Sequence, residues 1–462
     1  MLSASRMHLQ MAASGEGQRV FISSYSLPAD WQVEQADMLP PPLPTALKED
    51  VADSLRHPIA ALPLTELCSA TTTVVIACDQ PPSDAVRQTM LRGVLAQLEE
   101  AGVDPRRVTV LIASAMRDPI ITWDNSAQGA APVNAFNGAQ VVQHDPGDRH
   151  TLDELGNVEG VPLAIHYLAA EADLLIALFA APLEADLSHA GGCAVVTCGL
   201  AGLDTQRELR TTRFYDDQIT AQPVHRPLRR SVMQEGAKRA GLMFALGALL
   251  DAHGRAVAVR AGAPVAVDDA LSQLALGWYG AAVDAPSYDV LVAQPEGGKV
   301  RSGSLFDASL AAIRQGLPSR SVLTPGGVLV LPVLYHHDDD QTAAARAFHE
   351  TLSWANSPDA LVQRLQGNSL RDGEVQAYLI GHLAQRYRII IAGPQPRDHK
   401  HRGYFIYAPS MRDTAELAEN FVSKQPRALV VRRALTTLPI YGQVRFALDP
   451  LRTERAAPER WN

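Results

Sequence analysis

The apolar residues of the chain follow two alternating patterns. Short runs of consecutive apolar residues, typical of buried parallel strands, are separated by stretches in which apolar residues recur every three or four positions, typical of helices that cover a sheet. Thr72 to Ala77 is a β-branched run that predicts a strand, Ser83 to Gly102 bracket a helix, and Val108 to Ala113 predict a second strand. This order predicts a βαβ unit with parallel strands.

The same alternation continues over both halves of the chain. Strands are predicted over Ala139 to Gln143 and Leu174 to Phe179, and a long helix over Met233 to Leu250. After Pro286 a second series follows, with strands at 290–293, 328–333, 388–392 and 428–431 and helices at 305–313, 342–354, 375–385 and 414–422. The pattern predicts an α/β protein with two doubly wound domains, mostly parallel sheets and an interdomain cleft as the ligand site.

The segments differ in how regular their pattern is. Residues 1–65 contain the Pro-rich stretch 39–44 and little periodicity, which predicts an irregular N-terminal segment. The first α/β domain is expected over residues 66–280 and the second over residues 281–435. Residues 436–462 are expected to form a C-terminal tail.

Composition and charge narrow the class of partner. Hydrophobic residues make up 47% and charged residues 20% of the 462 residues, as in ordinary folded proteins. The net charge of −9 argues against a nucleic-acid partner, and a small anionic organic molecule is the expected ligand. No apolar run reaches the roughly 20 residues needed to cross a bilayer, and the first residues lack a continuous apolar segment. We therefore expect a cytoplasmic protein without membrane contact. The sequence leaves open whether the chain forms a homo-oligomer.

A series of short motifs resembles the lactate racemase family that uses a nickel-pincer nucleotide. The motifs occur in the family's order from about residue 70 to residue 425: Leu111–Pro119, His144-Asp145, Gly160–Pro162, Glu171–Ile176, Gly191-Gly192, Gly199–Gly202, Asp289–Val292, Leu305–Ala308, Pro325–Val328 and Gly373–Ala377. Each motif is short, and their order and spacing carry the resemblance. It implies the family's two α/β domains around a shared cleft.

The residues that bind the cofactor in that family are replaced here. The family tethers its nickel-pincer nucleotide through a lysine two residues after a Gly-Gly pair, whereas Gly191-Gly192 is followed by Cys193 and Ala194. The family's nickel-binding histidine corresponds to Arg210, a cation that would repel a metal. We therefore expect no nickel-pincer nucleotide and no protein-bound metal.

The family's catalytic residues are replaced as well. One catalytic histidine corresponds to Arg117, whose guanidinium does not give up a proton near neutral pH. The second falls on Leu183 or Glu184, of which only Glu184 can titrate. A substrate-contacting Gln and Lys of the second domain correspond to Asp307 and Leu310, and an early Asp-x-Thr-Arg-Pro segment has become Cys78–Pro82. The resemblance thus implies the fold more strongly than the chemistry.

Several remaining residues could form a different site. Glu184 and His189 lie on one loop after a predicted buried strand, where either could act as a general base. Arg117 and Arg210 could clamp a carboxylate. In the structural alternative, Glu184 and His189 belong to a solvated loop and Arg117 is a surface arginine in a salt bridge. The other expected substrate-binding residues are Asp79, Asp307, Gly191 and Gly192.

Three further features have a structural and a functional interpretation. Cys193 is either a reactive thiol or a small buried hydrophobic residue. His336 to Asp340 contain metal-type ligands, but a solvated acidic loop is the favoured interpretation. Arg207, Arg210 and Arg213 recur at helical spacing and either place positive charge in the cleft or line a solvated helix face.

Two functions of different class follow. The first is an enzyme of the isomerase or lyase kind that acts by acid/base chemistry on a small carboxylate-bearing, hydroxy-acid-like compound without the nickel-pincer nucleotide. The alternative is a non-catalytic ligand-binding or partner subunit, because the proton donors of the family are lost. A genuine nickel-dependent racemase or epimerase is the third hypothesis.

Overall fold

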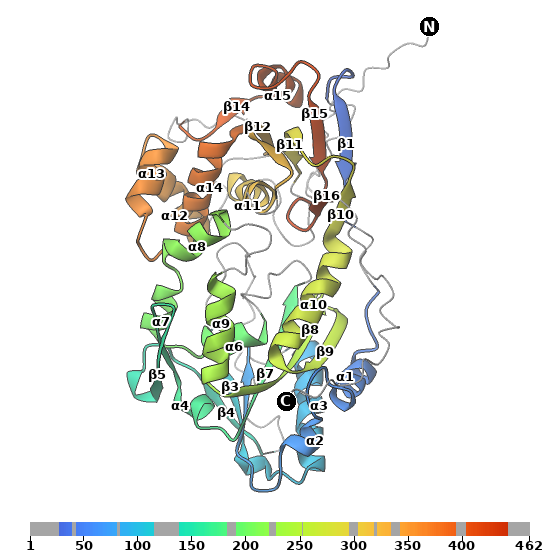
Figure 1. Cartoon of the computed structure of the whole chain (residues 1–462), viewed down its shortest axis with the longest axis vertical. Coiled ribbons are helices and arrows are strands. Elements are labelled where there is room, and N and C mark those ends of the chain that lie inside the picture. Colours follow the sequence, from blue (N-terminus) through green and yellow to red (C-terminus); the bar gives the residue numbers. More distant parts are fainter. Residues whose placement is uncertain are drawn as a thin grey trace, which may run out of the picture.

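The chain folds into two α/β halves that lie one above the other along its longest axis (Figure 1). A computed structural model describes residues 27–38, 43–80, 84–114, 138–182, 191–220, 228–251, 253–294, 304–317, 321–333, 342–393 and 403–441. Both halves are built on a six-stranded sheet with mostly parallel strands. Within these residues no helix is long and apolar enough to span a membrane.

The N-terminal half contains a sheet with the strand order β4-β3-β2-β7-β8-β9. Its strands are β2 Val74–Cys78, β3 Val108–Ile112, β4 Gln140–Gln143, β7 Leu174–Pro182, β8 Leu242–Leu250 and β9 Ala256–Gly262. Neighbours are parallel except β8 and β9, which pair antiparallel. Apolar residues on successive positions of β2 and β7 are buried on both faces, as expected for a parallel sheet that is covered by helices on both sides.

Alternate residues of these strands enter two separate cores. Val74 and Ile76 pack with helices α1 Leu47–Arg56, α2 Leu64–Leu67 and α3 Ala85–Glu100. Val75 and Ala77 pack with α6 Gly192–Thr197, α9 Leu228–Arg239 and α10 Pro264–Tyr279. The smaller elements of this half are the antiparallel pair β5 Leu152–Val158 and β6 Val161–His166, with α4 Tyr167–Ala170, α7 Leu203–Glu208 and α8 Thr212–Thr220. The period of two along each strand thus divides the apolar side chains between the two faces.

The C-terminal half contains an entirely parallel sheet with the order β1-β15-β11-β12-β13-β14. Its strands are β1 Gln32–Ala36, β11 Tyr288–Ala293, β12 Leu323–Pro332, β13 Arg388–Ala392, β14 Ile406–Ala408 and β15 Arg427–Val431. One face packs against α11 Leu305–Gly316, α12 Ala343–Leu352, α13 Pro358–Leu365 and α14 Glu374–Arg386, and the other against α15 Met411–Ala418. A separate pair, β10 Gly280–Val283 and β16 Leu438–Tyr441, follows α10 and closes the described chain.

The strand order reverses once in each sheet. In the N-terminal half β2 lies between β3 and β7, and in the C-terminal half β11 lies between β12 and β15. Open α/β sheets bind ligands beyond the carboxyl ends of their strands at such reversals. The structure confirms the predicted α/β class with mostly parallel sheets, while the cleft between the halves and the bounds of the two domains stay predictions.

The described part of residues 1–65 is not irregular, contrary to the sequence expectation. β1 pairs with β15 along all five of its residues, and α1 buries Val51 and Leu55 against α3. Gly93 of α3 permits this contact, because a Cβ atom there would lie 2.5 Å from Cγ1 of Val51. The sequence of β1, QVEQA, is too polar to predict a strand. β1 is an edge strand that is stabilised by pairing with β15. Residues 438–441 of the expected tail likewise form β16.

The predicted helix from Met233 to Leu250 is also wrong. Helix α9 ends at Arg239, Gly241 adopts a φ of +78°, and β8 then starts at Leu242. A left-handed glycine ends a helix at low cost. The residues after it pair with β7 on one side and β9 on the other, so that sheet pairing overrides the helical period of the sequence.

Candidate functional site

The carboxyl ends of three neighbouring strands meet at one edge of the N-terminal sheet. β2 pairs in parallel with β3 and with β7, so that the three strands end at the same edge: Asp79 follows β2, Ala113 follows β3, and Pro182 is the last residue of β7. The backbone N–H of Ala113 donates to the carbonyl of Cys78 at 2.8 Å, and the N–H of Asp79 donates to the carbonyl of Leu178 at 3.1 Å. This edge is therefore the natural place for a ligand.

Three of the expected site residues belong to segments that leave this edge. Arg117 is in the segment that follows β3, and Glu184 and His189 are in the segment that follows β7. All three lie outside the described residues, as does the expected acidic loop from His336 to Asp340. Their roles stay predictions.

Asp79, an expected substrate-binding residue, is engaged in an ion pair with Arg87 of α3. Nε of Arg87 donates to Oδ1 of Asp79 at 2.8 Å, and Nη2 donates to Oδ2 at 2.5 Å. Arg87 also contacts Asp84 at 2.8 Å and the carbonyl of Ala180 at 2.8 Å, and only 4% of the residue is exposed. The neighbouring carboxylates raise the pKa of Arg87 against the opposing effect of burial. Both oxygens of Asp79 are therefore held by a permanent cation.

Gly191 and Gly192, also expected to bind substrate, form the start of α6, and their amides are bound within the protein. Gly192 N–H donates to Oδ1 of Asp268 at 2.9 Å, and Cys193 N–H lies 3.5 Å from Oδ2 of the same carboxylate. Asp268 belongs to α10 and is 6% exposed. Burial raises the pKa of Asp268 to about 7, while the hydrogen bonds from Gly192 and Cys193 act in the opposite direction.

The surroundings of α6 do not fit the nickel-pincer nucleotide that the family resemblance implies. Ala194, which stands where the family has its tethering lysine, has no amine and is 3% exposed within the apolar core. A Cβ atom on Gly192 would lie 3.2 Å from Cβ of Ala245 and 3.3 Å from Cβ of Ala177, so the turn is packed against the sheet. No step of the proposed chemistry is therefore assigned to this group.

Cys193 is a buried thiol next to the same carboxylate. It is 4% exposed, and burial raises the pKa of its thiol, with a further contribution from Asp268. A protonated thiol can donate a hydrogen bond to a carboxylate but is a poor nucleophile. The structural interpretation of Cys193 is thus the better supported one.

Arg210 lies where the two halves meet. Its Nη2 atom is 3.4 Å from Oδ1 of Asp372, and its carbonyl accepts from Leu370 N–H at 3.0 Å. Thr212 N–H donates to the carbonyl of Asn368 at 3.1 Å, and Tyr378 donates its hydroxyl proton to Oδ1 of Asp216 at 2.5 Å. Arg207 and Arg213 form separate ion pairs with Asp204 and Glu208. Arg210 thus connects α7 and α8 to the segment before α14.

Asp307 lies in the first turn of α11, in the C-terminal half. It is 7% exposed, and its N–H donates to Oγ of the helix-capping Ser304 at 3.1 Å. The structure therefore places Asp79 with the end of β7, and Gly191 and Gly192 with α10. Arg210 lies at the junction of the halves, and Asp307 in the core of the other half.

Two histidines of the N-terminal half are buried together. The rings of His144 and His166 meet edge to face with centroids 5.5 Å apart, and they are 2% and 3% exposed. His144 Nε2 lies 3.0 Å from the carbonyl of Ala201, and His166 Nδ1 accepts from Leu168 N–H at 3.2 Å. Burial lowers the pKa of His166 to about 4 and also lowers that of His144. In the described residues no three His, Cys, Asp or Glu side chains are grouped to hold a metal ion.

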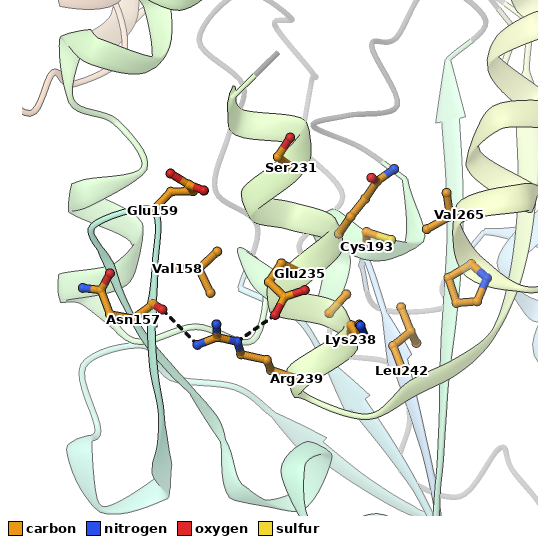
Figure 2. Close-up of a pocket in the computed structure, with 13 residues that line it drawn as sticks. Asn157, Val158, Glu159, Cys193, Ser231, Glu235, Lys238, Arg239, Leu242 and Val265 are labelled. Atoms are coloured by element: carbon orange, nitrogen blue, oxygen red, sulfur yellow. Dashed lines mark hydrogen bonds and ion pairs between the residues drawn. The ribbon is translucent and has the colours of Figure 1, made fainter. Parts of the chain in front are cut away.

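A hollow of about 710 Å³ opens between α9, the β5–β6 pair and the start of α10 (Figure 2). Glu235 and Asn157 hold Arg239 at its edge, and Cys193 contributes to its lining. Two carboxylates, those of Glu159 and Glu235, balance the charges of Lys238 and Arg239. Because these charges cancel, the hollow does not select for an anion.

Sequence reasoning missed Arg87, Asp268 and His166. The spacing of Asp79, Asp84 and Arg87 was the available signal for the first, since an arginine three residues after a helix cap reaches back to it. Asp268 shares the buried face of α10 with Val267, Leu271 and Ala275, so an acid on an apolar helical stripe was the signal for the second. His166 carried no signal of its own.

Comparison with known proteins finds a matching family and similar solved structures. Residues 22–214 match the family of the lactate racemase N-terminal domain. The lactate racemase apoprotein from Thermoanaerobacterium thermosaccharolyticum is similar with a TM-score of 0.69 and 17% identity, over 90% of this chain and 96% of that chain. A crystallised protein from Thermotoga maritima is similar with a TM-score of 0.50 and 13% identity, over 87% of this chain and 100% of that chain. No curated protein matches the chain in sequence.

At these identities the structural similarities establish the fold, and the family match establishes the relationship of the N-terminal part. The chain is therefore lactate racemase-like: residues 22–214 match the lactate racemase N-terminal domain family, and the fold resembles that of a lactate racemase apoprotein.

Proposed function

We propose that the chain binds a small carboxylate-bearing compound of the hydroxy-acid type in the cleft between its halves. It acts on this compound by acid/base chemistry of the isomerase or lyase kind, without the nickel-pincer nucleotide. The lactate racemase-like fold supports the class of substrate, since lactate is a small hydroxy acid.

One observation carries this proposal. The parallel pairing of β3, β2 and β7 makes the segments that contain Arg117, Glu184 and His189 leave the sheet at one edge. This edge lies at the reversal of strand order, where open α/β sheets bind ligands. The segments that contain this cation and these two titratable groups therefore start from the same edge of the sheet.

Each of these residues has a distinct role in the proposal. Arg117 binds the substrate carboxylate through its planar fork, which Lys cannot reproduce. Glu184 or His189 accepts a proton from the substrate and returns it, because a carboxylate and a neutral imidazole can both act as a general base. Asp79 takes no part in proton transfer, since Arg87 holds both of its oxygens.

Calorimetric titration with the two enantiomers of lactate tests the binding site. Arg117→Lys should weaken binding by about 5-fold to 150-fold, the equivalent of about 1 to 3 kcal/mol for a charge-assisted hydrogen bond. Arg412→Lys is the matched control, because the Arg412 side chain is 87% exposed on α15 in the other half. Equal affinities of Arg117→Lys and the unmodified protein would remove the anion clamp.

A non-catalytic, ligand-binding or partner subunit is the second candidate. The engagement of Asp79 by Arg87 and of the Gly192 amide by Asp268 favours it, because both groups are used by the protein itself. Incubation of lactate with the protein in D2O separates the two candidates. Deuterium at the carbon next to the carboxylate, lost in Glu184→Gln or His189→Asn, supports the enzyme, whereas binding without exchange supports the non-catalytic subunit.

A further inference from the structure

Helix α10 carries a carboxylate into the core of the N-terminal half. Asp268 is 6% exposed and lies among Val267, Leu271 and Ala275 on the buried face of the helix. Carboxylates are seldom buried this completely unless hydrogen bonds or charges compensate for lost water. Replacing Asp268 by an apolar residue would leave two buried backbone amides without an acceptor. The role of Asp268 can therefore be read from the groups to which it is hydrogen-bonded.

The partners of Asp268 are two backbone N–H groups and one thiol of a single turn. Its two carboxylate oxygens face the N–H groups of Gly192 and Cys193, at 2.9 Å and 3.5 Å. These amides open α6, so no carbonyl of the same helix is available to them. Gly192 is the second described residue after the segment 183–190, which contains Glu184 and His189. Asp268 therefore fixes the backbone at the start of α6.

The charged surroundings of Asp268 come from three helices. α6 contributes the Cys193 thiol, which hydrogen-bonds to the carboxylate, and α9 contributes Arg230. The neighbouring Asp269 on α10 pairs with Arg230 and takes up much of its charge. Strands β8 and β9 also pack against α10: β8 has no ionisable side chain, and Arg260 of β9 interacts with Asp50 of α1. The Asp268 carboxylate thus has one cation nearby, Arg230, which is shared with Asp269. Its stabilisation therefore depends mainly on its hydrogen-bond donors.

We propose that Asp268 is a positioning residue that holds the backbone at Gly192 and Cys193, where Gly191 and Gly192 are expected to contact the substrate. This inference rests on the proposed function for its consequence in ligand binding. An ionised carboxylate accepts from both amides, whereas a protonated one offers an O–H in place of one acceptor. Burial raises the pKa of Asp268 to about 7, so this exchange falls near neutral pH.

Asp268→Asn imitates the protonated acid without a change in size. Hydrogen exchange of the peptide covering residues 183–197, corrected for intrinsic rates, is measured by mass spectrometry at pH 5.5 and pH 8.5. The unmodified protein should be about 5-fold better protected at pH 8.5, the worth of about one hydrogen bond. Asp268→Asn should be equally unprotected at both pH values. Glu416→Gln, at a side chain that is 67% exposed on α15 in the other half, should behave like the unmodified protein.

Titration with lactate at the same two pH values adds the functional readout. Lactate should bind the unmodified protein several-fold more weakly at pH 5.5, and this difference should be absent in Asp268→Asn. If Asp268→Asn keeps the protection and the affinity of the unmodified protein at pH 8.5, the positioning role is overturned. If no variant binds lactate but the protection changes as described, the positioning role stands and the proposed function fails.

Discussion

Arg87, Asp268 and the His144–His166 pair show how ionisable side chains are accommodated inside this chain. Arg87 is neutralised by Asp79 and Asp84, and Asp268 is held by two backbone amides. The histidines are kept neutral, because burial lowers the pKa of both. Each of these arrangements responds differently to pH. The response of the histidines can be measured as a change in the free energy of unfolding.

The stability of the chain should fall in mild acid because of His166. Its pKa is about 4 in the folded state, below the 6.5 of an unperturbed histidine, so the unfolded chain takes up the proton first as the pH falls. The contribution of His166 is complete above pH 6.5 and is lost between pH 6.5 and pH 4, by about 1 to 3 kcal/mol. His144 acts in the same direction.

His166→Asn isolates this contribution. Asparagine retains an acceptor for Leu168 N–H but does not titrate. The difference in unfolding free energy between this variant and the unmodified protein, from urea denaturation, should therefore change between pH 7.5 and pH 4.5. His57→Asn, at a side chain that is 72% exposed, serves as the control. A difference that is constant over this range would contradict the assignment.

At the scale of elements, close packing of β7, β8 and α10 fixes the centre of the N-terminal half. A Cβ atom on Gly247 of β8 would lie 2.3 Å from Cζ of Phe179 and 2.8 Å from Cδ1 of Leu271. Gly247→Ala should therefore lower the unfolding free energy by about 1 to 3 kcal/mol. Urea denaturation provides the measurement.

Two further variants separate the clash from other effects of changing a glycine. Gly241→Asn should be nearly neutral, because a Cβ atom there meets nothing within 4 Å and Asn tolerates the φ of +78°. In the double variant Gly247→Ala with Phe179→Leu, the two destabilisations should be less than additive, since the smaller side chain relieves the contact. Full additivity would show that Phe179 is not the cause.

Elements that are buried on both faces could be predicted from the sequence. The predicted strand from Arg388 to Ala392 has the bounds of β13, and the apolar run from Leu174 lies within β7, because continuous burial leaves a continuous apolar signature. β1 escaped prediction because its partner strand, and not its own sequence, stabilises it. The apolar residues of 233–250 have a helical period, but residues 242–250 form strand β8 because they pair with β7 and β9.

The site was predicted less well than the fold for a related reason. Arg87 and Asp268 act through contacts that depend on the tertiary fold, and the partners of Asp268 are backbone amides. Backbone groups carry no residue-specific signal, so no spacing in the sequence reveals them. Arg210 could be singled out by comparison with the family, but its place beside Asp372 follows only from the way the halves meet.

At the scale of the whole molecule, the described part of the chain begins and ends with strands of the C-terminal half. β1 joins the C-terminal sheet, the elements from α1 to α10 contain the N-terminal half, and β10 returns directly from α10 (Figure 1). Helix α8 and Arg210 before it also connect the halves between these crossings: Asp216 accepts from Tyr378, Arg210 faces Asp372, and Tyr215 is buried in the core of the C-terminal half.

The central claim is that a lactate racemase-like fold is used here without the nickel-pincer nucleotide, and intact mass spectrometry tests it most directly. The protein is purified from cells that also make this cofactor, together with a lactate racemase that retains the tethering lysine as a positive control. Because Ala194 is a buried side chain without an amine, the mass should equal that of the polypeptide, with nickel far below one ion per chain. A covalent nucleotide adduct or near-unit nickel occupancy would contradict the account and favour a genuine nickel-dependent racemase.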